Sequence, residues 1–344
     1  MIRHFASRVD VLRNNVKLTE LVFSSAPSIY ASASAELKMS FSGKFRYNPL
    51  VDYLNDEIQP VIILDGIEHK LGIFRFSTIS SDYDEYGCQW DTIEAYDRGL
   101  KLKQAKVEDM LHFDAGEKYI NIITQLLIDA GITNIIQTDS TATLPVDRED
   151  WEIGTEYITI INQLLSEINY NSIWFNADGN AILQPYAAPT AENIQHIYDA
   201  TTPLSVIKRD CGVEFDIYDK PNVFIAIVSN PDFDQPLIAK AENNNPESAL
   251  SIIRRGLRIP EKINVDNIAS AEELQAYVDM VCNKSMLASQ EVDFSTAIMP
   301  GHGIGDIIAI NHPDISGIFE ETAWQIVLQA GRYMTHKAKK VVII

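Results

Sequence analysis

The stretch MPGHGIGDIIAI, at residues 299–310, carries the clearest structural signal in this sequence. Three glycines precede Asp306, and the four residues after it have the length and composition of a β-strand. A phosphate-binding P-loop would instead continue with Lys, then Ser or Thr, and then a helix. We therefore predict a loop that leads into a strand. Gly301, Gly303 and Gly305 are expected to serve backbone geometry, because glycine tolerates φ values that a Cβ forbids, and to bind neither phosphate nor metal.

The same stretch and the residues after it contain His302, Asp306, His312 and Asp314, whose side chains are of the types that bind metal ions. They lie on segments predicted to be loops, where such a site can assemble. No helical His-x-x-x-His pair and no cysteine pair accompanies them. We predict no metal site, no cofactor site and no catalytic residue. The Gly-x-Ser-x-Gly signature of α/β-hydrolases is missing as well.

Patterns typical of β-strands lie on both sides of a helical middle section. Within the first 110 residues, apolar and polar residues alternate at 35–41, and Asp65-Gly66 marks a hairpin turn. Several short strands there fit a barrel or a sandwich. Further strands are expected near residues 213–218, 223–228, 292–299, 306–310, 323–330 and 337–344. The chain is therefore predicted to be α+β and mainly β.

Helices are predicted in the middle of the chain. A capping box at Asp114 and Glu117 begins the first helix, and Gly131 suits its C-terminal cap. Residues 157–168 repeat the apolar pattern of that helix. The other signals are a hairpin that turns at Asp178-Gly179 and a third helix that begins at a second capping box, Ser270 to Glu273.

The 344 residues carry a net charge of −20. This acidity argues against binding to the nucleic-acid backbone, but it is compatible with a surface past which nucleic acid slides. Cys88, Cys211 and Cys282 are scattered, as is typical of buried thiols in a reducing compartment. No apolar run approaches the roughly 20 residues of a membrane span, and the first residues lack the apolar core of a signal peptide. We therefore expect synthesis in the cytoplasm.

Basic side chains concentrate at two places in this acidic chain. Residues 254–258 form the densest cluster, and we predict that they contact an acidic face of the same or a neighbouring subunit. Residues 337–340 lie on the last predicted strand, where lysines often protect an exposed edge. The candidate subunit contacts are Arg254, Arg255, Arg258, Lys337, Lys339 and Lys340.

Three segments of the chain resemble the hub proteins of phage tails, a family often called XkdQ-like. They are residues 216–223 (DIYDKPNV), residues 245–248 (NPES) with the arginines that follow, and most specifically residues 299–306. The last segment resembles the Pro-Gly…Gly-Asp element that precedes a strand of the second barrel in these proteins. The family is related to the baseplate hub of contractile phages and to the base of type VI secretion spikes. The resemblance spans most of the chain and is densest after residue 150.

The resemblance implies two tube-like β-barrels with a helix-containing inserted domain. The first barrel would occupy residues 1–110. An α/β insert with two helices and a hairpin would occupy residues 111–202. The second barrel would occupy residues 203–344, with strands at about 203–230 and 290–344 and a loop-and-helix insert at 231–289.

The resemblance also implies a structural role without enzymatic activity. A homotrimeric ring would join the tail tube to the central spike in a phage, a prophage, a bacteriocin or another contractile injection system. The implied partners are the tail tube protein, the spike protein, other baseplate proteins, and a tape-measure protein or DNA that passes through the lumen; no membrane is implied. The chain would be made in the bacterial cytoplasm and become a virion-like component. We also expect acidic residues to line the channel, because they repel phosphate over about 8–10 Å at physiological salt.

Two other functions fit the same composition. A cell-wall (peptidoglycan) hydrolase needs a carboxylate pair at a set distance across a cleft, which sequence does not give. A carbohydrate-binding β protein would stack sugars on exposed tryptophans, and the chain has four of them. They are Trp90, Trp151, Trp174 and Trp324.

Overall fold

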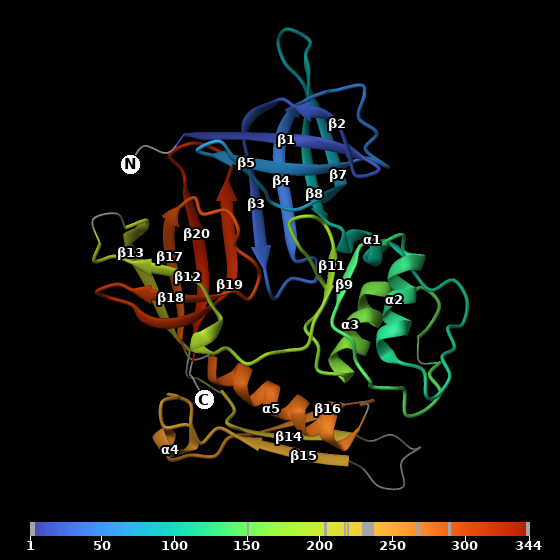
Figure 1. Cartoon of the computed structure of the whole chain (residues 1–344), viewed down its shortest axis with the longest axis vertical. Helices are drawn as coiled ribbons and strands as arrows, with labels where there is room; N and C mark the ends of the chain where they lie inside the picture. Colours follow the sequence, from blue (N-terminus) through green and yellow to red (C-terminus); the bar gives the residue numbers. More distant parts are fainter. Residues whose placement is uncertain are drawn as a thin grey trace.

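The computed structural model describes residues 4–149, 151–202, 205–216, 218, 220–228, 237–265, 267–268, 270–287 and 290–341. Two β units, an α/β unit and a small sheet covered by one helix make up these residues (Figure 1). The prediction of an α+β, mainly β chain is confirmed. No helix within the described residues has the length and apolar character that a membrane span requires.

The first β unit is built around one bent strand. Only Val22 separates β2 from β3, so the two run on as one bent strand. Its first half, β2, pairs with β1, and its second half, β3, pairs with β4. The neighbours then follow in the order β4, β8, β7 and β5, and β5 also pairs with β1. Asp65 and Gly66 both have positive φ and join β5 to β6, as predicted. The strands are β1 (Phe5–Arg13), β2 (Val16–Leu21), β3 (Phe23–Ser32), β4 (Met39–Arg46), β5 (Glu57–Leu64), β6 (Ile67–Lys70), β7 (Phe74–Tyr83) and β8 (Gln89–Asp97), followed by helix α1 (Gly99–Gln104).

The second β unit repeats this strand order. Its neighbours follow as β13, β17, β20, β19, β18 and β12, which matches β3, β4, β8, β7, β5 and β1. The matched end pairs differ, because β12 and β18 run parallel whereas β1 and β5 run antiparallel. The strand predicted after Asp306 is β18. The strands are β12 (Ile194–Asp199), β13 (Ile207–Phe215), β17 (Gln290–Ala297), β18 (Ile307–Asn311), β19 (Ser316–Val327) and β20 (Tyr333–Lys340).

A single ladder joins the two β units into one continuous sheet of fourteen strands. Strand β19 pairs antiparallel with β3, from Ala323 opposite Ser32 to Val327 opposite Ser28. The two segments lie about 290 residues apart in the chain. Inward-facing side chains of β19 also join the core of the first β unit, where Trp324 and Ile326 pack with Ile29. We call the β19–β3 ladder the seam.

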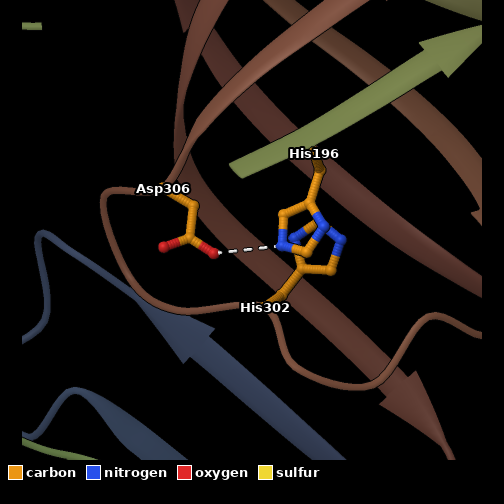
Figure 2. A group of neighbouring side chains, drawn as sticks. All are labelled: His196, His302 and Asp306. Carbon is orange, nitrogen blue, oxygen red and sulfur yellow. Dashed lines mark ion pairs between the residues drawn. The ribbon is translucent and has the colours of Figure 1, made fainter. Parts of the chain in front are cut away.

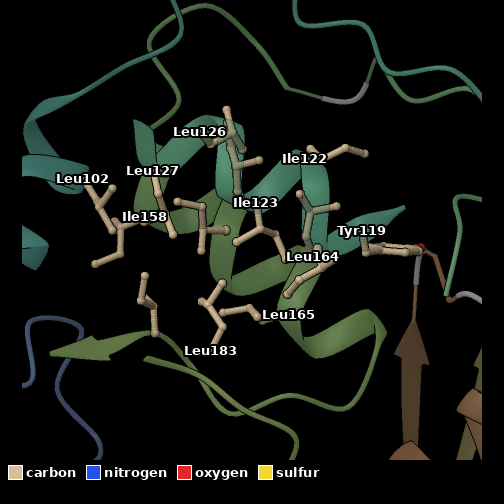
Figure 3. Close-up of a cluster of buried hydrophobic side chains, with 14 of the residues drawn as sticks. Leu102, Tyr119, Ile122, Ile123, Leu126, Leu127, Ile158, Leu164, Leu165 and Leu183 are labelled. Carbon is tan, nitrogen blue, oxygen red and sulfur yellow. The ribbon is translucent and has the colours of Figure 1, made fainter. Parts of the chain in front are cut away.

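The α/β unit has its own core (Figure 3). Helices α2 and α3 pack their apolar faces on each other and on β11, as their repeated pattern predicted. The prediction of the α2 cap is wrong in detail: the helix begins after Lys118, and the Glu117 side chain accepts a hydrogen bond from Asp114 N in the turn before it. Gly131 ends α2 at φ +76°, as predicted. The elements are α2 (Tyr119–Asp129), β9 (Ile135–Gln137), α3 (Tyr157–Glu167), β10 (Trp174–Phe175), β11 (Ala181–Leu183) and the short helix η1 (Ala191–Asn193).

The last unit is a three-stranded sheet covered by α5. The structure differs here from the sequence-based boundaries, because the strand at 223–228 pairs within this sheet, while the second β unit takes in residues 194–199 instead. The β pattern of the chain does not reveal which sheet a strand joins. The N-cap of α5 is confirmed, since Ser270 Oγ accepts a hydrogen bond from Glu273 N, while the Glu273 carboxylate accepts from Asn169 Nδ2. The elements are β14 (Val223–Val228), β15 (Leu237–Glu242), α4 (Ile252–Arg255), β16 (Pro260–Val265) and α5 (Ala271–Leu287).

Candidate functional site

A network of buried polar side chains fills one end of the second β unit. The glycine-rich loop at residues 299–306 carries His302 inward, where it meets Glu321 of β19 and His336 of β20. The Nδ1 atoms of the two imidazoles contact the two oxygens of the Glu321 carboxylate. All three side chains are completely inaccessible to solvent. Ionisable groups are rarely buried this deeply unless every polar atom has a partner.

The other imidazole nitrogens also have partners. The Nε2 atom of His302 lies 2.5 Å from the Tyr198 hydroxyl, and that of His336 lies 2.8 Å from the Thr296 hydroxyl. Because a carboxylate only accepts, each neutral ring donates Nδ1–H to Glu321, and Nε2 of His302 then accepts the proton of the Tyr198 hydroxyl. The Thr296 hydroxyl lies 2.8 Å from His336 Nε2 and 2.8 Å from Ala297 O, so its one proton has two acceptors. The whole group is therefore a closed hydrogen-bond network inside the protein.

Burial changes the proton affinities in this network. Desolvation lowers the pKa of His302 to about 3 and lowers the pKa of His336 below its ordinary value. Desolvation also raises the pKa of Glu321, although the hydrogen bond from His336 opposes this change. Both imidazoles are consequently neutral at neutral pH, in agreement with the tautomers that their partners assign.

The glycine-rich loop is held beside the network by Asp306 and His196 (Figure 2). The His196 ring stacks on the His302 ring, with centroids 3.9 Å apart and planes 16° apart, and its Nε2 lies 3.3 Å from Asp306 Oδ2. Burial alone would raise the pKa of Asp306, but hydrogen bonds from His196 and Gly303 N lower it below its ordinary value. A Cβ at Gly303 would lie only 2.7 Å from Asp306 Oδ1, so this glycine permits the close approach of the carboxylate.

The other two glycines of the loop have a different role. Gly301 and Gly305 have φ values of +101° and +79°, which side chains with a Cβ rarely adopt. Gly305 N also donates a hydrogen bond to Glu321 O, and this bond ties the loop to β19. The expected geometric role of the three glycines is therefore visible in the fold.

The arrangement of the imidazole rings around His302 is unfavourable for binding a metal ion. The His196 and His302 rings lie face to face, so the nitrogen lone pairs of the two rings lie in nearly parallel planes, an unfavourable arrangement for two ligands of one tetrahedral ion. Around Glu321, each imidazole nitrogen already has a hydrogen-bond partner of its own. A hydrogen-bond network accounts for both groups.

The four residues considered from sequence as metal ligands separate into two places. His302 and Asp306 lie beside His196, whereas His312 and Asp314 lie near Cys211. In that second group the Cys211 Sγ is 3.9 Å from His312 Nδ1, which also accepts a hydrogen bond from Asp314 N. Burial raises the pKa of the Cys211 thiol. A thiol with a raised pKa is a weaker nucleophile and metal ligand at neutral pH.

The basic residues predicted to contact subunits occupy two settings. Near α4, Arg258 pairs with Glu242 at 2.5 Å and Arg255 donates to Lys220 O at 2.8 Å, while Arg254 is exposed. The prediction of an exposed edge at residues 337–340 is wrong, because β20 pairs with β17 on one side and with β19 on the other. Lys337 instead lies among Glu291 and Asp293 on the face of this sheet. Lys339 and Lys340 are half-buried on the same strand.

Sequence reasoning missed Glu321, His336, His196 and Tyr198. A signal existed for His336, which alternates in phase with the inward-facing Met334 and Ala338 of β20. No such signal marked Glu321, because the register of β19 shifts between Glu321 and Ala323 and breaks the alternation.

One row of side chains crosses the seam on the outer face of the sheet. Four successive cross-strand pairs place five polar or tyrosine side chains side by side, and all five are exposed or half-buried. A groove of about 460 Å³ lies over this part of the sheet, with Asp210 and Asp293 at its wall. The seam row consists of Ser295, Thr335, Gln325, Tyr30 and Ser40.

Comparison with solved structures identifies this architecture. A tail protein from Neisseria meningitidis superimposes with a TM-score of 0.68 over 98% of this chain and 96% of its own, at 12% sequence identity. The 43 kDa tail protein of prophage MuSo2 from Shewanella oneidensis gives 0.68 over 97% and 98%, at 11% identity. The chain has the fold of a phage tail protein. No family model matches the sequence, and no curated protein matches it.

A third similar structure is a component of a secretion system. A component of the Escherichia coli type VI secretion system, described as similar to the T4 bacteriophage tail proteins gp27 and gp5, gives a TM-score of 0.55. The match covers 99% of this chain and 77% of that one, at 8% identity. The resemblance to tail hub proteins drawn from sequence therefore agrees with the three-dimensional fold.

Two of the four tryptophans cannot support sugar binding. Trp151 and Trp324 are buried, so their rings are not available to stack on a sugar. Trp90 is half-buried and donates to Asp84 Oδ2 at 3.0 Å, which fixes the β7–β8 hairpin.

Proposed function

We propose that this chain is a structural hub in the baseplate of a phage-type tail or contractile injection system. In this proposal three copies form a ring that joins the tail tube to the central spike. The observation that carries the proposal is the seam, since the β19–β3 ladder joins two β units of equal strand order into one sheet. The fold shared with phage tail proteins supports the same role.

The repeated strand order suits a change of symmetry. We infer that each β unit is a tube-like barrel, with residues 1–110 forming the first and strands β12, β13 and β17 to β20 forming the second. Three chains would then present six similar units, which match a sixfold tube while the ring keeps the threefold symmetry of a spike. A continuous hydrogen-bonded sheet suits this task, because it fixes the orientation of the two units more firmly than a flexible linker does.

The seam row suggests which face turns to the channel. Its hydroxyl and amide side chains offer a cargo weak hydrogen bonds and little net charge, while Asp210 and Asp293 add negative charge nearby. Lys337 lies there too, close to Glu291 and Asp293. We propose that this face lines the channel, where it would let DNA or a tape-measure protein pass without tight binding. The arginines at 254–258 would lie away from the channel, on α4 and the loop that follows it.

The remaining parts of the proposal concern the setting of the ring. Its partners would be the tube, the spike and other baseplate proteins, and the chain would be made in the bacterial cytoplasm before it joins the particle. Its role would be structural and would involve no catalysis.

Light scattering on the purified chain tests the proposal, and a trimer is the expected state at micromolar concentration. Electron microscopy of the chain mixed with tube and spike proteins encoded beside it should then reveal a ring between the two. A chain that stays monomeric at every concentration and binds neither protein would overturn the proposal.

A further inference from the structure

The sheet β15–β14–β16 has one covered face and one open face. Phe224, Ala226 and Val228 of β14 point toward α5 and form a core with it. Helix α5 lies between this sheet and the rest of the molecule, so the opposite face turns outward (Figure 1). No described segment packs as a further layer on that face, where Ile238 is 64% exposed.

The open face combines apolar and basic side chains. Ile225 pairs across the strands with Lys240 on one side and with Lys262 on the other, so two ammonium groups flank one isoleucine. The next row places Ile227 beside Ile238. At the end of the face, Glu242 accepts hydrogen bonds from both Lys240 and Arg258, each at 2.5 Å. Three cations against one carboxylate leave this face basic, in a chain whose net charge is −20. We define the open face as Ile225, Ile227, Ile238, Lys240, Glu242, Arg258 and Lys262.

The opposite end of the molecule carries a surface of complementary chemistry. The hairpin between β7 and β8 projects beyond the first β unit, at the far end of the long axis from the open face (Figure 1). Its tip has three carboxylates, of which Asp82 pairs with Lys44, and two tyrosines that are 70% and 82% exposed. The tip consists of Asp82, Tyr83, Asp84, Glu85 and Tyr86.

The tip is rigid enough to act as a binding element. The Asp84 carboxylate accepts hydrogen bonds from Tyr86 N and Cys88 N, at 2.9 and 2.8 Å, and from Trp90 Nε1. These bonds lower the pKa of Asp84, that from Trp90 most strongly. A hairpin tip held in one conformation loses little conformational entropy when it binds.

We propose that the open face binds the β7–β8 tip of a neighbouring copy of this chain. The tyrosines would lie on the isoleucines, and the carboxylates of Asp82 and Glu85 would face Lys240 and Lys262. One copy does not bring its own two surfaces together, because they lie at opposite ends of the molecule. A contact of this kind is heterologous, and heterologous contacts generate a closed ring when the rotation between copies closes. The inference rests on the proposed ring and names one of its contacts.

Charge reversal tests this contact directly. The variant Lys240→Glu/Lys262→Glu changes the open face, and Asp82→Lys/Glu85→Lys changes the tip. Each is expected to raise the dissociation constant of the oligomer by about tenfold or more, because like charges then face each other. The combination of all four substitutions restores opposite charges and is expected to restore assembly. Light scattering over a concentration series measures all four proteins.

A matched control separates the contact from net charge. Lys106→Glu/Lys118→Glu makes the same change in charge on the α/β unit, at two lysines that are 53% and 40% exposed, and is expected to leave assembly intact. Circular dichroism checks that each variant is folded. Raised salt should weaken the wild-type oligomer, since exposed charges are screened beyond about 8 Å at physiological ionic strength.

Three results would overturn the inference. If the open-face variant assembles like the control, the proposed contact is wrong, while the proposed ring is still supported. If the open-face variant dissociates but the fourfold variant does not recover, a surface other than the tip occupies the open face. If the wild-type chain is monomeric at every concentration, both the proposed ring and the proposed contact are wrong.

Discussion

The two β units share a strand order but fill their interiors differently. The first is packed with apolar side chains such as Ile29, Phe41 and Phe74, each at most 1% exposed. The second has an apolar part around Phe319 and a polar end built on Glu321 and its two histidines. The same arrangement of strands therefore accepts two kinds of interior.

The two kinds of interior differ in the substitutions that they tolerate. An apolar core tolerates exchange of one hydrophobic residue for another when volume is conserved. A buried network tolerates no loss of a partner, because a remaining polar atom then pays the full desolvation cost. The second unit is therefore expected to be the more sensitive to conservative substitution and to acid.

The largest single effect is expected in the first unit. Phe41→Ala removes a ring that stacks on Phe45 and packs near Phe74, and should lower the free energy of unfolding by about 3–5 kcal/mol. Urea titration measures the loss, which should change little between pH 7.5 and pH 5, because the side chains that pack with Phe41 in this core are hydrophobic. A strong pH dependence of the loss would contradict the contrast between the units.

Removal of the central carboxylate should cost nearly as much in the second unit. Glu321→Ala leaves two buried Nδ1–H groups without an acceptor and should lower the free energy of unfolding by about 3 kcal/mol. Glu321→Gln is the matched control. Its amide can accept from one ring and donate to the other after one tautomer changes, so it should cost clearly less. Equal losses in urea titrations of the two variants would count against a hydrogen-bond network.

Acid should destabilise the second unit. The pKa of His302 is about 3 in the folded chain and ordinarily 6.5, so the unfolded chain binds more protons between these values and stability falls as pH drops below about 6.5. His336 acts in the same direction, whereas the raised pKa of Glu321 opposes the change. Asp306 and His196 are the other titratable groups that contact the loop side.

We expect His302 alone to account for a loss of about 2 kcal/mol between pH 7.5 and pH 5. Burial raises the pKa of Asp97 in the first unit to about 6, and this group opposes part of the loss. His302→Gln removes the group responsible for the loss, so the slope of stability against pH should become shallower. Urea titrations at both pH values measure this slope. An unchanged slope in the variant would place the acid sensitivity elsewhere in the chain.

The smallest effect concerns one hydroxyl. Tyr198→Phe removes the donor to His302 Nε2 and should lower the free energy of unfolding by about 1 kcal/mol. Tyr30→Phe, on the outer face of the seam, is the control and should change it by less than about 0.5 kcal/mol. Thermal unfolding of both variants compares them, and identical midpoints would mean that the buried hydroxyl contributes nothing.

Local patterns predicted local structure well. Asp65-Gly66, Asp178-Gly179 and Ser270 each marked a turn or a helix start that the structure contains. Long-range pairing was not predictable in the same way. The apolar run of β14 is the same whether it pairs in a barrel or in a separate sheet, so its place in the small sheet followed only from the structure.

The site was even less accessible to sequence reasoning. His302 and Asp306 stood out because they lie in a glycine-rich loop, but their partners come from strands far along the chain. His196 is more than 100 residues away from both. Glu321 lies at a bulge, where the alternation that would have marked it as buried is broken. The sequence contains every residue of the network, but the long separations between them and the bulge in β19 kept their contacts from being predicted.

The seam also constrains how the chain is made. The edge of β3 at Ser28–Ser32 gains its partner only when residues 323–327 have left the ribosome. At typical synthesis rates of about 5–20 residues per second, that interval lasts some tens of seconds. Throughout it the first unit has an unpaired strand edge, the feature that promotes aggregation in nascent chains. Ser28 on β3 and Ser42 on the neighbouring β4 form a hydrogen bond of 3.1 Å between their hydroxyl groups. These hydroxyl groups make one face of the β3 edge polar until β19 pairs with it.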